Sequence, residues 1–100
     1  NLYFPDFEWN QVQLNKDFPC PPHLDSDNVG ESVLVAFGNY LDGNTCIYRN
    51  EKIEKYDARE KPLRFNGSKL LHWVQPIRSV GTRYSVVFFN NPYGLKKNNK

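Results

Sequence analysis

Frequent turn signals break this sequence into short runs of β-favouring residues, and no stretch keeps a helical period for more than about two turns. Alternating or continuous apolar runs occur at residues 9–14, 32–38, 45–48, 53–58, 70–74 and 82–89. Turn-forming residues separate them, for example in Asp42-Gly43-Asn44 and Asn66-Gly67. About six to eight short strands joined in this way predict an all-β fold, either a sandwich or a jelly-roll barrel.

The size of the chain predicts one small domain. It has 100 residues, of which 39% are hydrophobic and 15% aromatic, enough for a single core. We expect a lead-in at residues 1–8, the β core at residues 9–90 and a flexible tail at residues 91–100. The chain has no methionine, which we interpret as a catalytic core cut from a longer protein. No apolar run approaches the length of a membrane span, so no membrane partner is expected.

Charge and cysteine content narrow the function classes. The formal net charge of +2 is weak evidence about partners, and a nucleic-acid reader often carries a denser basic face. The two cysteines, Cys20 and Cys46, do not make a disulfide framework, and neither shows C-x-x-C metal-ligand spacing. Cys46 lies in an apolar run and is predicted to be a buried thiol. Free thiols favour a reducing, intracellular location.

Two histidines and one aspartate carry the strongest chemical signal. His23 and Asp25 are two positions apart, and on a β-strand this spacing puts both side chains on one face. Prolines before His23 hold the chain extended, and His72 follows on a later strand-like run. In a jelly roll, strands that are far apart in sequence become neighbours. Two imidazoles and one carboxylate are the facial ligand set of non-haem Fe(II), which leaves coordination positions open.

The last β-type run, residues 82–89, adds a second group of candidates. Alternation places Arg83 and Ser85 on one face of this strand and Tyr84 on the other. An arginine that faces a core needs an anion, and its planar guanidinium is suited to a carboxylate. A facial triad with an inward Arg-x-Ser motif is what a 2-oxoglutarate-dependent oxygenase requires, with Arg83 and Ser85 on the 5-carboxylate of the co-substrate.

Taken together, these motifs resemble the signature of the 2-oxoglutarate/Fe(II)-dependent dioxygenase superfamily. The signature is carried by His23-x-Asp25, His72 and Arg83-x-Ser85. Three longer stretches, residues 15–28, 65–72 and 81–89, resemble its TET/JBP-like branch, the oxygenases of 5-methylcytosine and thymine in nucleic acid. The likeness covers roughly residues 10–90. We therefore predict a mainly β fold with a double-stranded β-helix (jelly-roll, cupin-like) core and little helix.

The resemblance implies an enzyme that uses Fe(II), 2-oxoglutarate and O2 to hydroxylate a C–H bond. His23, Asp25 and His72 are then the catalytic metal ligands. Arg83 and Ser85 bind the co-substrate. The implied substrate is the methyl group of 5-methylcytosine or thymine in DNA or RNA, presented on a base flipped out of the duplex. A substrate in DNA also implies a nuclear location.

Two questions keep alternative answers: which residues contact the substrate, and to which function class the protein belongs. Asn28 stands just past the triad motif, where polar residues of the family approach the substrate, and an Asx turn also explains an asparagine there. Asn15 and Tyr84 are expected to lie behind the residues that bind the metal and the co-substrate, and to contact those residues. One alternative is a 2-oxoglutarate-dependent hydroxylase of protein side chains or of a small molecule. Another is a non-catalytic jelly-roll module that binds a metal or ligand.

Overall fold

Eight β-strands form the fold in a computed structural model that describes residues 4–17, 19–78 and 81–92. The strands are β1 (Gln11–Lys16), β2 (Cys20–His23), β3 (Ser32–Asn39), β4 (Thr45–Arg49), β5 (Lys52–Tyr56), β6 (Leu63–Phe65), β7 (His72–Val74) and β8 (Thr82–Phe89). Essentially no helix is present in this part of the chain. The prediction of a mainly β protein is therefore confirmed.

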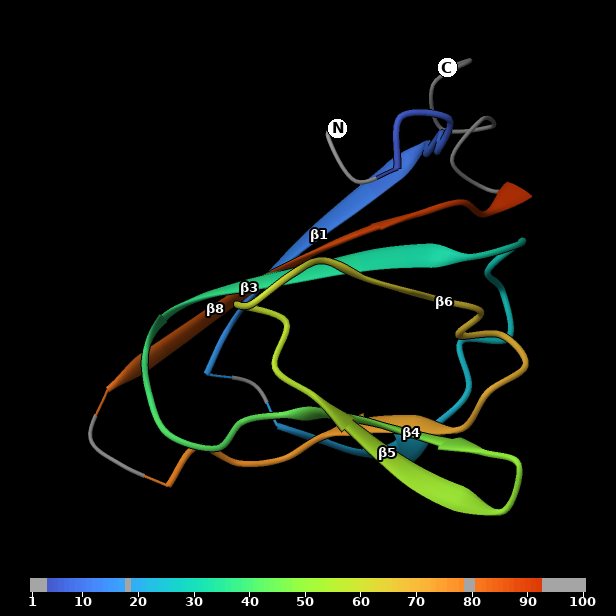
Figure 1. Ribbon diagram of the computed structural model, residues 1–100. Coiled ribbons are helices and arrows are strands. Elements are labelled where there is room, and N and C mark those ends of the chain that lie inside the picture. Colours follow the sequence, from blue (N-terminus) through green and yellow to red (C-terminus); the bar gives the residue numbers. More distant parts are fainter. Residues whose placement is uncertain (1–3, 18, 79–80, 93–100) are drawn as a thin grey trace.

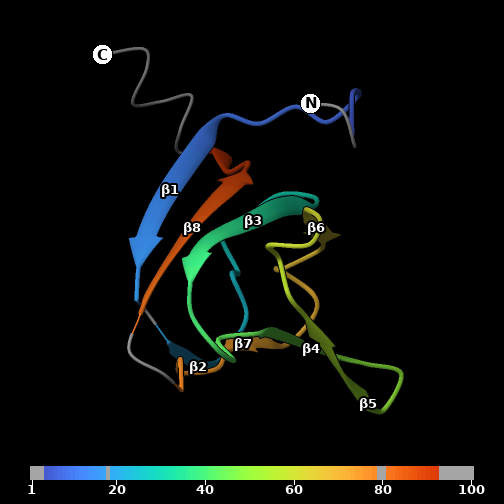
Figure 2. The ribbon, with the colours of Figure 1, turned by 60° about the vertical axis from the view of Figure 1, so that its left-hand side comes forward.

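Two antiparallel four-stranded sheets face each other across the molecule (Figures 1 and 2). One has the strand order β1-β8-β3-β6, and the other has the order β2-β7-β4-β5. In the first sheet β8 is central and pairs with both β1 and β3. In the second sheet β7 is central and pairs with both β2 and β4. The two central strands therefore carry His72 and Arg83 on opposite layers.

The predicted bounds of most strands agree closely with the observed bounds, but those of the first strand differ. The run at residues 82–89 coincides with β8, and the continuous apolar run at residues 32–38 is β3 with one further residue. The predicted strand at residues 9–14 is instead shifted to Gln11–Lys16. It ends at Lys16, just before Asp17, whose φ of 49° takes the chain out of the extended conformation.

Strand β2 can contain two prolines because it is an edge strand of its sheet. Proline has no N–H to donate to a ladder, so it is tolerated at an edge where no partner needs that donor. The register of β2 against β7 is also irregular between Cys20 and His23. The edge position thus explains how a Pro21-Pro22 pair can precede His23 within a strand.

The hydrophobic core lies between the sheets and draws on both. Its buried members are Leu34, Ala36, Ile47, Ala58 and Phe65. The side chain of Ile47 is fully buried, which corresponds to about 1.5–3 kcal/mol of transfer free energy. Cys46 is also fully buried, as predicted, and burial raises the pKa of its thiol.

The N-terminal segment packs against the outer face of the β1-β8-β3-β6 sheet. Phe7 is buried and its ring stacks on Trp9 at 6.2 Å between centroids. Trp9 in turn contacts Phe88 of β8 edge to face at 5.1 Å. Of the tail predicted at residues 91–100, residues 93–100 lie outside the described residues. None of the described helical residues forms a segment long and apolar enough to span a membrane.

Candidate metal centre

The two histidines meet across neighbouring strands. His23, at the end of β2, is paired in register with His72, at the start of β7. Their ring centroids lie 4.3 Å apart. His72 is buried, whereas His23 is only partly covered. The antiparallel pairing of β2 and β7 therefore brings together the only two histidines of the chain.

Asp25 completes the group from outside the strand, which corrects one expectation. His23 and Asp25 do not share a strand face, because β2 ends at His23. The loop instead turns Asp25 back: its backbone N–H donates to the Gly67 carbonyl at 2.9 Å, and its carbonyl accepts from Asn28 N–H at 3.0 Å. These bonds fix the carboxylate beside the imidazoles.

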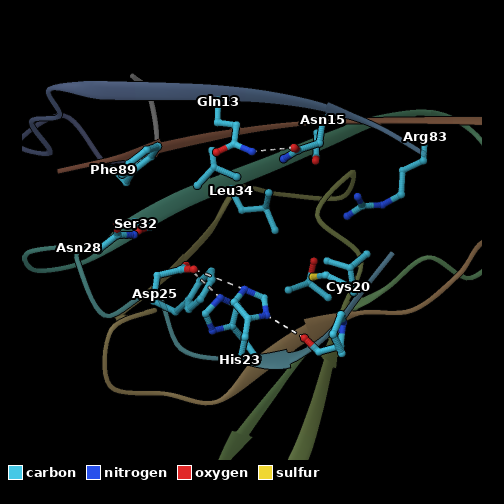
Figure 3. Close-up of a pocket in the computed structure, with 17 residues that line it drawn as sticks. Gln13, Asn15, Cys20, His23, Asp25, Asn28, Ser32, Leu34, Arg83 and Phe89 are labelled. Atoms are coloured by element: carbon cyan, nitrogen blue, oxygen red, sulfur yellow. Dashed lines mark hydrogen bonds and ion pairs between the residues drawn. The ribbon is translucent and has the colours of Figure 1, made fainter. Parts of the chain in front are cut away.

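The carboxylate of Asp25 lies close to atom Nε2 of both imidazole rings. Its Oδ1 lies 3.4 Å from His23 Nε2, and its Oδ2 lies 3.2 Å from His72 Nε2 (Figure 3). One ligand atom from each of the three residues lies within 4.8 Å of the others. Among the described residues, this group could hold a metal ion.

Backbone carbonyls set the tautomer of both rings. His23 Nδ1 lies 2.8 Å from the Pro21 carbonyl, and His72 Nδ1 lies 2.8 Å from the Leu70 carbonyl. Because a carbonyl can only accept, Nδ1 carries the proton that it donates, and a neutral ring then presents a lone pair at Nε2. Both lone pairs face the Asp25 carboxylate. Acceptors facing each other at this distance need a cation between them, either a proton or a metal ion.

The protonation equilibria of the group reflect this arrangement. The hydrogen bond from His72 lowers the pKa of Asp25, and the nearby histidine charges lower it further, against the opposing effect of burial. For His72, burial alone would lower the pKa, but the hydrogen bonds with Asp25 and the Leu70 carbonyl outweigh it and the pKa is raised. Without a metal, the proton between these groups is therefore held tightly.

Gly67 leaves the space that the triad occupies. A Cβ at this position would lie 3.0 Å from Asp25 Oδ2 and 3.1 Å from His72 Cε1. Phe65, two residues earlier, packs its ring edge to face against His72 at 4.9 Å. The segment after β6 therefore packs against the His-Asp-His group from one side. A side chain at residue 67 would displace Asp25 or His72.

The triad opens into a cavity of about 390 Å³ between the two sheets. Arg83 and Ser85 line the same cavity and are only 3% exposed each. The guanidinium of Arg83 points into it, and its Nε and Nη2 have no hydrogen-bond partner among the described residues (Figure 3). Although the guanidinium also lies 5.7 Å from the centre of the Tyr40 ring, these two buried donors could take an anionic group that enters the cavity, since a buried donor without a partner is costly.

Strand alternation along β8 separates the predicted residues into two groups. Arg83 and Ser85 face the cavity with Val87 and Phe89. Tyr84 lies on the opposite face, where its ring stacks on Phe37 at 5.7 Å. Tyr84 therefore does not line the cavity, because odd and even residues of a strand point to opposite sides.

The two predicted asparagines both lie on the cavity. Asn15 is paired in register with Ser85, and its Oδ1 accepts a hydrogen bond from Gln13 Nε2 at 3.0 Å. Asn28 lines the cavity from the loop that follows Asp25. Both side chains are thus placed to meet a bound molecule.

Of the lining residues that were not among the predicted site residues, three carry a thiol or a hydroxyl group. They are Cys20, Ser32 and Thr45. Ser32 Oγ and Thr45 Oγ1 are buried and have no hydrogen-bond partner among the described residues. Cys20 is a free thiol whose pKa is raised by burial. The only sequence signal for the two hydroxyls was a polar residue beginning an otherwise apolar strand.

Comparisons with known proteins leave the site to be interpreted on its own chemistry. No protein-family model matches the chain, and no curated protein sequence matches it at a significant level. What the geometry establishes is a His-Asp-His group able to hold a metal ion, beside a buried arginine with free donors, in one cavity of a two-sheet β protein.

Proposed function

We propose that this protein is an Fe(II)- and 2-oxoglutarate-dependent dioxygenase. The observation that carries the proposal is the shared cavity: His23, Asp25 and His72 line it together with Arg83, whose buried guanidinium has free donors. A metal-binding site alone has no need of a buried cation nearby. A co-substrate that chelates the metal at one end and carries a carboxylate at the other needs both.

The strand order supports a double-stranded β-helix as the scaffold. Successive strands alternate between the sheets, except that β4 and β5 form a hairpin within one of them. This gives the orders β1-β8-β3-β6 and β2-β7-β4-β5, as expected when a long hairpin is wound into a jelly roll. In such a scaffold the space between the sheets is the natural place for a ligand.

Each residue of the centre has a distinct task in this proposal. His23, Asp25 and His72 hold the iron through Nε2, a carboxylate oxygen and Nε2, with Nδ1 of both rings fixed on backbone carbonyls. When bound, the iron supplies the redox chemistry that couples conversion of 2-oxoglutarate and O2 to succinate and CO2 with insertion of one oxygen atom into a C–H bond.

Arg83 and Ser85 hold the 5-carboxylate of 2-oxoglutarate. The free Nε and Nη2 of Arg83 are adjacent donors that match a carboxylate in a two-bond arrangement. Ser85 is buried on the same face of β8 and adds a hydroxyl. Fixing one end of the co-substrate aims its keto acid end at the metal and excludes water from the inner part of the cavity.

The proposed substrate is the methyl group of 5-methylcytosine or thymine in DNA or RNA, with the base flipped into the cavity. Its support is the resemblance of residues 15–28, 65–72 and 81–89 to the TET/JBP-like oxygenases, and the position of Asn28 on the cavity. The rival substrates are a protein side chain and a small molecule. Mass spectrometry of nucleosides after reaction with methylated or thymine-containing DNA separates them, because only the nucleic-acid substrate yields an oxidised base.

Succinate formation tests the reaction type. Purified protein with Fe(II), ascorbate and 2-oxoglutarate should release succinate, and His72→Ala and Arg83→Leu should each reduce the rate at least about 100-fold. Arg78→Leu is the matched control, because Arg78 pairs with Asp42 at 3.1 Å on the surface, away from the cavity. Equal succinate from the wild type and His72→Ala would reject the enzyme. Metal binding without any effect of 2-oxoglutarate would favour a non-catalytic binding module.

A further inference from the structure

Strand β1 leaves one edge of its sheet open. It stands at the end of the order β1-β8-β3-β6, with β8 on its inner side (Figure 2). Its other side pairs with no strand in the part of the chain that the structure describes. An edge strand presents unpaired N–H and C=O groups on which another chain can form a ladder, so folds usually protect such edges.

The other edges of the two described sheets are protected in ways that β1 is not. Strand β2 carries the Pro21-Pro22 pair, β5 alternates charged with apolar residues in the sequence Lys-Ile-Glu-Lys-Tyr, and β6 is only three residues long. By contrast, β1 is six residues long and carries no charge before its last residue, Lys16. Its edge can therefore accept a further strand along most of its length.

The backbone groups at this edge belong to Val12, Leu14 and Lys16. Asp17 N–H donates to the Arg83 carbonyl, so alternate residues counted back from Asp17 bond to β8 in this antiparallel ladder. The residues between them turn their N–H and C=O groups away from β8. The side chains of Val12 and Leu14 are also 57% and 66% exposed, so apolar surface accompanies the free backbone groups.

The charges at the two ends of β1 complement those of a second copy of the same strand. Glu8 precedes the strand and Lys16 ends it, both are exposed, and neither forms an ion pair with a described residue. Asp17, the next residue, is instead engaged with Arg83 N–H through Oδ1. Antiparallel pairing of two β1 strands brings the Lys16 end of each toward the Glu8 end of the other. Parallel pairing would place like charges together.

A two-fold axis at Gln13 gives a register in which the apolar residues meet. Val12 then lies opposite Leu14 of the second copy, on the same face of the sheet, and the two Gln13 residues face each other. Val12 and Leu14 are also the residues that turn their backbone groups to the open edge, so the same register forms hydrogen bonds between the strands. Both requirements of a sheet joint are therefore met together.

We propose that the open edge of β1 is a homodimer interface, at which a second copy of this chain pairs its own β1 antiparallel and joins the two β1-β8-β3-β6 sheets into one. Gln13 and Asn15 of this strand line the cavity, so the interface borders the cavity of each copy. The inference goes beyond the proposed function and does not depend on a bound metal or co-substrate.

Sedimentation velocity of the full chain over a range of concentrations tests the interface. The wild type should form a dimer, and Leu14→Lys should raise its dissociation constant at least about tenfold, because the substitution places two added cations at the joint. Ile53→Lys is the matched control, since Ile53 is 60% exposed on the edge strand β5, and it should leave the dissociation constant unchanged. Both side chains are exposed, so both variants should fold. A monomeric wild type, an undiminished dimer in Leu14→Lys, or an equal loss in both variants would overturn the proposal.

Disulfide trapping tests the register in a Cys20→Ser background. Cysteines at position 13 of the two copies would form a non-hydrogen-bonded pair with Cα atoms about 4.5 Å apart, which suits a disulfide. Gln13→Cys should therefore give a covalent dimer on mild oxidation. Gln11→Cys should not, because its two copies lie about 13 Å apart in this register. No covalent dimer of Gln13→Cys, or equal trapping of both variants, would overturn the register. A monomeric wild type that binds a synthetic alternating valine–threonine peptide at residues 12–16 would assign the edge to an extended peptide instead and overturn the homodimer.

Discussion

Substitution of Gly67 tests whether steric crowding by an added Cβ, rather than backbone strain, disturbs the candidate metal centre. A Cβ there would crowd Asp25 Oδ2 at 3.0 Å and His72 Cε1 at 3.1 Å. Gly67→Ala should therefore weaken Mn(II) binding at least about tenfold, since small displacements of a ligand are costly. Gly30→Ala is the control: its φ of 72° is strained for alanine but nothing lies within 4 Å of the added Cβ. It should lower stability by about 1 kcal/mol and leave metal affinity unchanged. Equal metal affinity in both variants would contradict this account.

The pair of His72 and Asp25 should give the metal-free protein a characteristic pH dependence of stability. The raised pKa of His72 contributes stability that is complete below its ordinary value of 6.5 and is lost as pH rises through the folded value. The lowered pKa of Asp25 contributes stability present above 3.8 and lost as pH falls through its folded value. Urea unfolding should thus show lower stability at about pH 8 than at about pH 5.5. His72→Gln should remove this part of the slope, and an identical slope in both proteins would refute the assignment.

Residue types with fixed chemistry were predictable from the sequence, and residues defined by their surroundings were not. The chain has only two histidines, and an arginine in an apolar strand needs a specific partner. These properties make four residues stand out: His23, Asp25, His72 and Arg83. Ser32 and Thr45 become informative only when burial and missing partners are known, and neither can be read from a pattern. Gly67 gave only a turn signal, because a steric limit set by another segment leaves no local trace.

At the level of elements, the junction of β1 and β8 positions Arg83. Asp17 N–H donates to the Arg83 carbonyl at 2.7 Å, and Asp17 Oδ1 accepts from Arg83 N–H at 2.7 Å. Asp17→Ala removes the acceptor and places alanine at a φ of 49°. It should cost about 1–3 kcal/mol of unfolding free energy and weaken 2-oxoglutarate binding. Asp17→Asn keeps an oxygen and tolerates this φ, so it should retain most of both. Similar losses in the two variants would argue against the junction.

Strands could be predicted to the extent that periodicity is local. The continuous apolar run of β3 and the alternation of β8 follow from which faces are buried. The position of Asp25 did not follow, because its backbone bond to Gly67 comes from a distant segment and turns it off the strand. The side-chain spacing of His23 and Asp25 therefore predicted the right neighbours for the wrong local reason.

At the level of the whole molecule, the metal ion and 2-oxoglutarate, as proposed, would together contact residues of both sheets. The residues that could hold a metal come from β2, β7 and the loop after β2, whereas Arg83 belongs to β8 in the opposite sheet. A 2-oxoglutarate molecule bound to both the metal and Arg83 should therefore oppose separation of the layers. Mn(II) alone engages only the His-Asp-His side, and 2-oxoglutarate alone lacks its chelating partner.

The two ligands should consequently stabilise the protein more than additively. At 100 times its dissociation constant, a ligand specific for the folded state adds about 2.7 kcal/mol, which raises Tm by about 10 °C or more in a domain of this size. Thermal unfolding should show a small rise with Mn(II), almost none with 2-oxoglutarate, and the large rise only with both. Arg83→Leu should keep the Mn(II) rise and lose the additional rise with 2-oxoglutarate, because the ligand then contacts one sheet only. An undiminished joint effect in that variant would show that the co-substrate does not bridge the sheets through Arg83.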